Sequence, residues 1–313
     1  MMFLDGCFLM QYIILGDTSP VLLNRMTLST GPSIHKDIFL LENQIPWLVL
    51  EVLTEFMSVD VSRFVHDMEL KFLPAARKVK LVNGRRRMPW GCTGGGTEHQ
   101  YKPSHLLGLL RFTQVGSMPE YMVNDTGFPL SLSSSAVELA QIGVRLAPST
   151  EPWFGVMRVR RGLLFGELSL SPPFLNDVTA CWLVNMAALE ASTAGATGAS
   201  DGYVVSSYLS VLAMLMDSDD DVQQLRAKEV LHSTFSNKEV LRFFKGLARH
   251  LRFGVRYYAT LEEIESYKRH RAVRIAIHKL LYNSFKAMTI ATLFSIVGVL
   301  VGIFKTLLDN KKH

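Results

Sequence analysis

Cysteine is scarce in this chain, and so are charged residues. The 313 residues include three cysteines, Cys7, Cys92 and Cys181. They are far apart and odd in number, so a disulfide-stapled fold is excluded. Charged residues make up 19% of the chain and hydrophobic residues 48%. That balance excludes intrinsic disorder of the whole chain, and a chain of this length can bury a sizeable core.

The sequence also lacks the motifs that would name a reaction. It has no phosphate-binding G-x-x-x-x-G-K-[ST], no G-x-G-x-x-G and no G-x-S-x-G elbow, and its nine histidines show no zinc-site spacing. Asp217, Asp219 and Asp221 imitate a calcium loop, but Val222 and Lys228 stand where that loop needs Gly and Glu. We therefore predict no catalytic, cofactor-binding or metal-binding residue. A hydrolase or transferase with a site outside the known motifs is the alternative.

The excess of positive charge lies in one loop and beside one apolar segment instead of covering a surface. The net charge is +5. One basic run lies in residues 77–87, within a segment, 77–104, whose glycines predict an irregular loop. A solvated loop is the favoured interpretation of Arg85, Arg86 and Arg87, and a localisation signal or phosphate contact is the alternative. A nucleic-acid partner is not expected, because the excess does not form a basic face.

The second basic region precedes a long apolar segment. Residues Ala287 to Phe304 are eighteen residues without a charge, bracketed by Lys286 and Lys305. As a helix they would extend roughly 27 Å, close to the hydrocarbon thickness of a bilayer. We predict one transmembrane helix over residues 285–307, a globular unit over 1–284 and a short tail over 308–313. A buried helix of a soluble core is the alternative.

The flanks of this span predict its orientation and one partner. Six Lys and Arg residues lie between residues 266 and 286, against three beyond the span. The bulk of the chain should therefore lie on the cytoplasmic side of the membrane. The plasma membrane is expected in preference to the membrane of an organelle. The chain would insert as a tail-anchored protein, and the sequon at Asn124 would stay unglycosylated. Gly298 and Gly302 form a GxxxG pattern that could pair two copies as a homo-dimer.

Periodicity and capping patterns predict a mainly α fold with a small β hairpin or sheet. Helices are expected over residues 37–42, 105–112, 176–191, 203–216 and 237–251, with another beginning near Pro46. Capping boxes at Ser135, Ser236 and Thr260 should open helices, and Gly143 should end one. Strands are expected over 144–146, 156–160 and 163–170.

Apolar residues at helical spacing occur near the start and after Pro46. Leu4, Phe8, Tyr12 and Leu15 predict a buried helix. After Pro46, a second apolar face is expected from Trp47, Val49, Leu50, Leu53 and Phe56. With nothing before it, the first helix would need missing or partner sequence to cover it.

Six segments in order resemble a plant-specific family catalogued as domain of unknown function 247. Residues 5–9 resemble its "DGCF" block and residues 105–111 its "HLLHLLR" block, while residues 136–145, 185–190 and 203–217 resemble three later blocks. The most specific match is "DIFLLENQIPW" at residues 37–47, similar to "DLLLLENQIPF". It contains the family-motif residues Asp37, Leu41, Glu42, Asn43, Gln44 and Pro46.

The resemblance implies a plant membrane protein without an established enzymatic activity. Members of the family usually have about a hundred further residues before the first block, and some are implicated in grass self-incompatibility. A recognition, signalling or protein-interaction role is therefore the expected function, with the lipid bilayer and an as yet unknown protein as partners.

Overall fold

The computed structural model describes residues 2–15, 27–73, 102–115, 134–150, 154, 157–162, 166–193, 203–254 and 257–270, with 295 and 299 as isolated positions. Within these residues the chain is mainly helical and has a small mixed sheet. The predicted fold class is confirmed in this respect. No helix among the described residues is both long enough and apolar enough to cross a bilayer. The predicted span 287–304, with its GxxxG pair, lies outside the described residues apart from the two isolated positions.

The first half of the described chain is helical. Its elements are α1 (Met2–Leu15), α3 (Thr27–Ile38), the 3-10 turn η2 (Leu41–Asn43), α4 (Trp47–Met57), α5 (Val61–Glu69), η3 (Leu70–Phe72) and α7 (Leu106–Val115). Pro46 is the N-cap residue of α4, so the predicted helix start there is confirmed. The helix predicted over 37–42 is wrong, because α3 ends at Ile38 and only a 3-10 turn follows. Most of the predicted loop 77–104 lies outside the described residues.

The second half combines helices with the sheet. Its elements are α8 (Ala136–Gln141), β1 (Val144–Pro148), β2 (Met157–Arg161), β3 (Gly166–Leu170), β4 (Phe174–Leu175), α9 (Asp177–Thr193), α10 (Val204–Met214), α11 (Asp219–Ala227), β5 (His232–Ser233), α12 (Asn237–Ala248) and α13 (Tyr258–His270). In the three-stranded sheet β3 lies between β1, to which it is parallel, and β2, to which it is antiparallel. The predicted strands are thus confirmed within a few residues.

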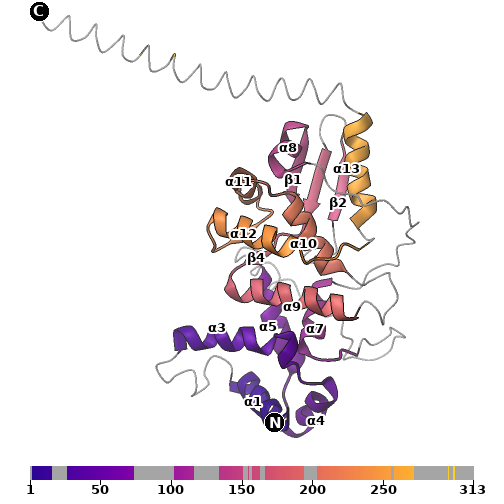
Figure 1. Ribbon diagram of the computed structural model, residues 1–313. Helices are drawn as coiled ribbons and strands as arrows, with labels where there is room; N and C mark the ends of the chain where they lie inside the picture. The colour runs from indigo at the N-terminus through magenta and orange to yellow at the C-terminus, as the bar shows by residue number, and fades with distance from the viewer. Residues whose placement is uncertain are drawn as a thin grey trace, which may run out of the picture.

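The elements are arranged along one long direction (Figure 1). The sheet, α8 and α13 lie at one end, and α1 and α4 lie at the opposite end. Helices α9 and α10 lie between them, and α3, α5 and α7 lie beside α9 toward the α1 end. The two ends are therefore joined through a helical centre.

A series of aromatic rings forms the centre of the core. Phe39 lies 4.9 Å from Trp182, which lies 5.5 Å from Phe72. Phe72 in turn contacts Phe154, and Phe154 stacks on Tyr208 at 4.9 Å. These ring contacts, which are favourable beyond simple burial, join α9 and α10 to segments that lie well before them in the sequence. All five rings are almost fully buried.

Capping patterns located several helix ends correctly. Ser135 and Ser236 each form the full capping box, and Gly143 takes the left-handed conformation after α8. The prediction at Thr260 is wrong, because α13 already begins at Tyr258. A further box, Ser218 with Asp221 at the start of α11, was not predicted. The acidic residues Asp219, Asp220 and Asp221 thus lie in the first turn of a helix.

The first helix forms as predicted but exposes other residues than expected. Tyr12 and Leu9 are buried, whereas Leu4 and Phe8 are 69% and 52% exposed. Because α1 has apolar residues on all sides, periodicity alone could not choose its buried face. The packing of α4 against Gly6 chooses it, since a Cβ there would meet the Leu53 side chain at 2.6 Å. Phe56, which belongs to the apolar face predicted for α4, is 81% exposed.

Candidate functional site

The segment that carries the most specific family resemblance is a structural connector. Gln44 donates from Nε2 to the carbonyl oxygens of Ile38 at 2.9 Å and Leu40 at 2.7 Å, and its Oε1 accepts from the Leu107 N–H at 2.8 Å. One side chain therefore ends α3, shapes the turn after it and binds the first turn of α7. Carbonyls at the end of a helix need such partners because they have none within it.

Neighbouring residues of the same segment bind two further elements. The Leu41 N–H donates to Oδ1 of Asn185 in α9 at 2.8 Å, and the Trp47 N–H donates to the Ser104 carbonyl at 2.7 Å. Asn43 makes a longer contact to the Asp37 carbonyl at 3.5 Å. The segment 37–47, the start of α7 and α9 are thus fastened together by hydrogen bonds to the backbone.

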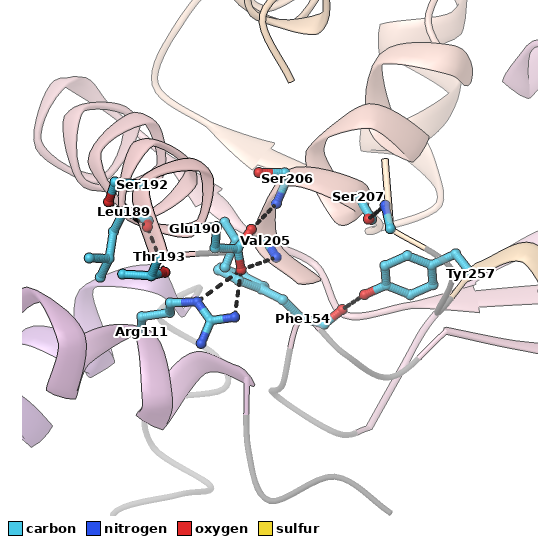
Figure 2. A network of polar contacts seen from close by, with 11 residues as sticks. Arg111, Phe154, Leu189, Glu190, Ser192, Thr193, Val205, Ser206, Ser207 and Tyr257 are labelled. Atoms are coloured by element: carbon cyan, nitrogen blue, oxygen red, sulfur yellow. Dashed lines mark hydrogen bonds and ion pairs between the residues drawn. The ribbon is translucent and has the colours of Figure 1, made fainter. Parts of the chain in front are cut away.

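The ends of two other resembling segments meet in a buried ion pair (Figure 2). Arg111 of α7 lies 2.8 Å from the Glu190 carboxylate of α9, whose side chain is fully buried. The same carboxylate accepts from the N–H groups of Val205 and Ser206, both at 2.9 Å. Helix α10 has no capping side chain of its own, so Glu190 supplies its N-terminal cap from another helix.

The surroundings of the Glu190 carboxylate change its pKa. Burial raises the pKa of Glu190, and the charge of Arg111 and the two backbone N–H donors oppose that rise without cancelling it. The network holds α7, α9 and α10 together. It presents no open face to a substrate, because Glu190 and the bonded N–H groups are buried.

A groove lies on the outer side of this connector, between α1, the last turns of α3 and the turn that follows. Its volume is about 570 Å³, and it is lined by Met2, Asp5, Phe8, Leu9, Ile34, Asp37, Ile38, Glu42, Asn43, Gln44, Ile45 and Leu106. Met2 and Phe8 are each 52% exposed, so the groove opens to solvent. Its volume falls within the range of about 300–1,000 Å³ that is usual for ligand clefts.

The chemistry of the groove favours binding. Apolar side chains form its floor and walls, and Asp5, Asp37 and Glu42 stand exposed around them. Its described lining contains no Ser, Cys, His or Lys that could serve as a nucleophile or as the partner of one. Among the described residues, no group of His, Cys, Asp and Glu is placed to hold a metal ion.

Four of the predicted motif residues meet in this groove, namely Asp37, Glu42, Asn43 and Gln44, whereas Leu41 and Pro46 do not line it. Asp5, Met2, Phe8 and Leu106 also line the groove but were not among the predicted site residues. In the sequence, Asp5 is the one charged residue in an otherwise apolar first stretch, and this was a signal that sequence reasoning could have used. The Arg111–Glu190 pair was missed as well, although opposite charges end the two resembling segments.

The fold therefore defines a mainly helical protein, with a small mixed sheet at one end and an acid-rimmed apolar groove at the other. The chain belongs to the family DUF247, described as plant protein of unknown function, whose model matches residues 1–301. The resemblance found in the sequence is confirmed. No solved structure matches the chain.

A curated relative supports the same assignment. The chain is 26% identical over 291 residues to the Arabidopsis thaliana protein named UPF0481 protein At3g47200. The match covers 82% of this chain and 55% of the relative. The chain therefore spans about half the length of that relative.

Proposed function

We propose that this protein recognises another protein while held at a membrane, and that it performs no catalysis. The observation that supports recognition is the open groove at the α1 end, with apolar walls and exposed acidic residues. Large exposed apolar patches next to polar rims are typical of interaction sites. The groove is also supported from behind by the hydrogen bonds of Gln44 and Leu41, which would keep its shape constant during binding.

The membrane part of the proposal is supported by the sequence alone. Residues 287–304 are apolar without a charge, and six Lys and Arg residues precede them. In this arrangement the basic flank faces anionic cytoplasmic lipids, each charge contributing about 1 kcal/mol near the surface. The groove would then face the cytoplasm, together with Asn124.

The function is tested by isolating the full chain from plant membranes in a mild detergent. We expect one other protein to co-purify in a constant ratio. The purified chain should also fail to turn over generic ester, amide, glycoside and phosphate-ester substrates. Recovery of the chain alone, together with multiple turnovers of one of these substrates, would favour the alternative of a hydrolase or transferase.

The orientation has a separate test. Glycosylation of Asn124 in plant cells, or protection of the globular part from protease in sealed microsomes, would place that part on the lumenal side. We expect neither result.

A further inference from the structure

Large apolar side chains are also exposed near the groove, on α1 and α4. Phe3 and Leu4 are exposed on the outer side of α1, and Leu48, Val52 and Phe56 are exposed along α4. The two helices lie side by side at one end of the molecule. Large exposed apolar side chains that cluster on a folded protein usually mark an interaction site.

The charged residues in the described lining of the groove are all acidic. Asp5, Asp37 and Glu42 are exposed, and no described residue forms an ion pair with any of them. Among the described residues that line the groove there is no Lys or Arg. Glu51 and Glu55 on α4 add acids to the same end, where Lys102 pairs with Glu51 at 3.2 Å. An apolar floor with a negative rim is complementary to a ligand that is apolar at its centre and positive at its edges.

We propose that the groove binds a helical segment of a partner protein whose apolar stripe is flanked by Lys or Arg. The inference rests on the proposed recognition function and names the chemistry of the partner. Apolar anchors at i, i+3, i+4 and i+7 would enter between Phe8 and Ile38, as in other helix-in-groove contacts. The basic flanks would face Asp5, Asp37 and Glu42.

Two other occupants fit the charges less well. A two-fold dimer through this groove would bring its acidic rim toward the rim of the second copy, and like charges in contact are unfavourable. An anionic membrane surface would repel the same carboxylates. A cationic helix meets neither obstacle.

The test measures binding of a fluorescent synthetic peptide to the full chain in a neutral detergent. The peptide has about 16 residues, enough to form a helix on binding, with Leu at i, i+3, i+4 and i+7 and Lys elsewhere. A twin peptide has Glu in place of Lys. We expect the Lys peptide to bind at least about tenfold more tightly than its twin, and its affinity to fall with added salt.

Matched variants locate the site. D37N/E42Q removes two exposed rim charges without changing their shapes and should weaken binding of the Lys peptide about fivefold. D220N/E262Q removes the same charge from exposed positions on α11 and α13, away from the α1 end, and should change little. Phe8→Ser should weaken binding of the Lys peptide at low and high salt alike.

The proposal is overturned if both peptides bind equally, or if the two charge variants lose the same affinity. It is also overturned if Phe8→Ser instead converts a dimer to a monomer in sedimentation, or releases the chain from anionic vesicles. A co-purifying plant protein that D37N/E42Q leaves in place would refute this groove as its site while the recognition function stands. Absence of any such protein would refute the function itself.

Discussion

Gln44 is the residue on which the shape of the most specific motif depends. Its amide donates to two carbonyls and accepts from one N–H group, a set that only a neutral amide of this length satisfies. The motif residues exposed in the groove have a different role, since no hydrogen bond or ion pair links the Asp37 and Glu42 side chains to another described element. The motif thus combines connecting and surface residues.

Substituting Gln44→Glu should destabilise the protein by about 2 kcal/mol or more, because two donor bonds are lost and a carboxylate is placed against two carbonyls. The matched control is Asn43→Asp, the same chemical change at an exposed neighbour, which should stay within about 0.5 kcal/mol. Urea unfolding of the full chain in mild detergent measures both. Equal effects would show that Gln44 does not connect α3 to α7.

The free energy of unfolding should depend on pH through the carboxyl group of Asp221. Burial alone would raise the pKa of Asp221, but hydrogen bonds from the Ser135 side chain, Val137, Ser218 and Asp217 outweigh it and lower that pKa. A carboxyl with a lowered pKa in the folded state stabilises the fold above its unfolded pKa of about 3.9. This contribution is lost as the pH falls through the folded pKa.

Asp221→Asn should therefore cost about 2 kcal/mol at pH values near 7. The difference from the unchanged protein should shrink as the pH falls below about 4. Asp220→Asn, an exposed change in the same helix turn, should show neither effect beyond a few tenths of a kcal/mol. Urea titrations at several pH values supply the measurement. A constant difference at all pH values would contradict the assignment.

At the level of elements, helix α10 depends on a residue outside itself. It is buried along nearly its whole length, and its first free N–H groups meet the carboxylate of Glu190. The same carboxylate binds Arg111, so α7, α9 and α10 share one polar contact inside an apolar core. If one partner is removed, the other buried polar groups lose their hydrogen bonds, which costs free energy.

Glu190→Gln should lower the free energy of unfolding by about 2 kcal/mol or more, because one amide oxygen cannot replace two carboxylate oxygens and Arg111 loses its counter-charge. Glu167→Gln in β3 is the control. Its ion pair with Arg160 is exposed and 3.8 Å long, so a change below about 0.5 kcal/mol is expected. Thermal unfolding compares the two. Similar shifts would mean that the buried pair is no more important than a surface pair.

At the level of the whole molecule, the proposed membrane helix would determine on which surface the groove operates. Val297→Arg combined with Leu300→Arg should release the full chain from membranes at alkaline pH, since each charge costs about 2.5 kcal/mol or more at the centre of a span. The control, Val297→Leu with Leu300→Val, keeps the segment apolar, and the chain should stay with the membranes when they are sedimented after the alkaline wash. Retention of the arginine variant would refute the anchor.

Local patterns in the sequence were sufficient for much of the fold. The capping boxes at Ser135 and Ser236 and the left-handed Gly143 located helix ends, because these contacts form within a few residues. The three strands were found because β-forming residues alternate there. Even the wrong start of α13, at Thr260 instead of Tyr258, is an error of only a few residues.

The groove and its supports could not be found in this way. Leu4, Phe8 and Phe56 have the same character as buried neighbours, and only the packing of α1 on α4 decides which of them stay exposed. The contacts of Gln44 with Leu107 and of Glu190 with Val205 join segments 63 and 15 residues apart. No local pattern encodes such a pairing.

The sequence by itself determined that this chain is a mainly helical member of a plant family, with an apolar segment long enough to span a bilayer. These properties follow from composition, short-range periodicity and motif order. Only the tertiary structure decided that the family motif both fastens α3, α7 and α9 together and lines an acid-rimmed groove. The physical reason is that a side chain's partners and its exposure depend on which distant elements pack against it.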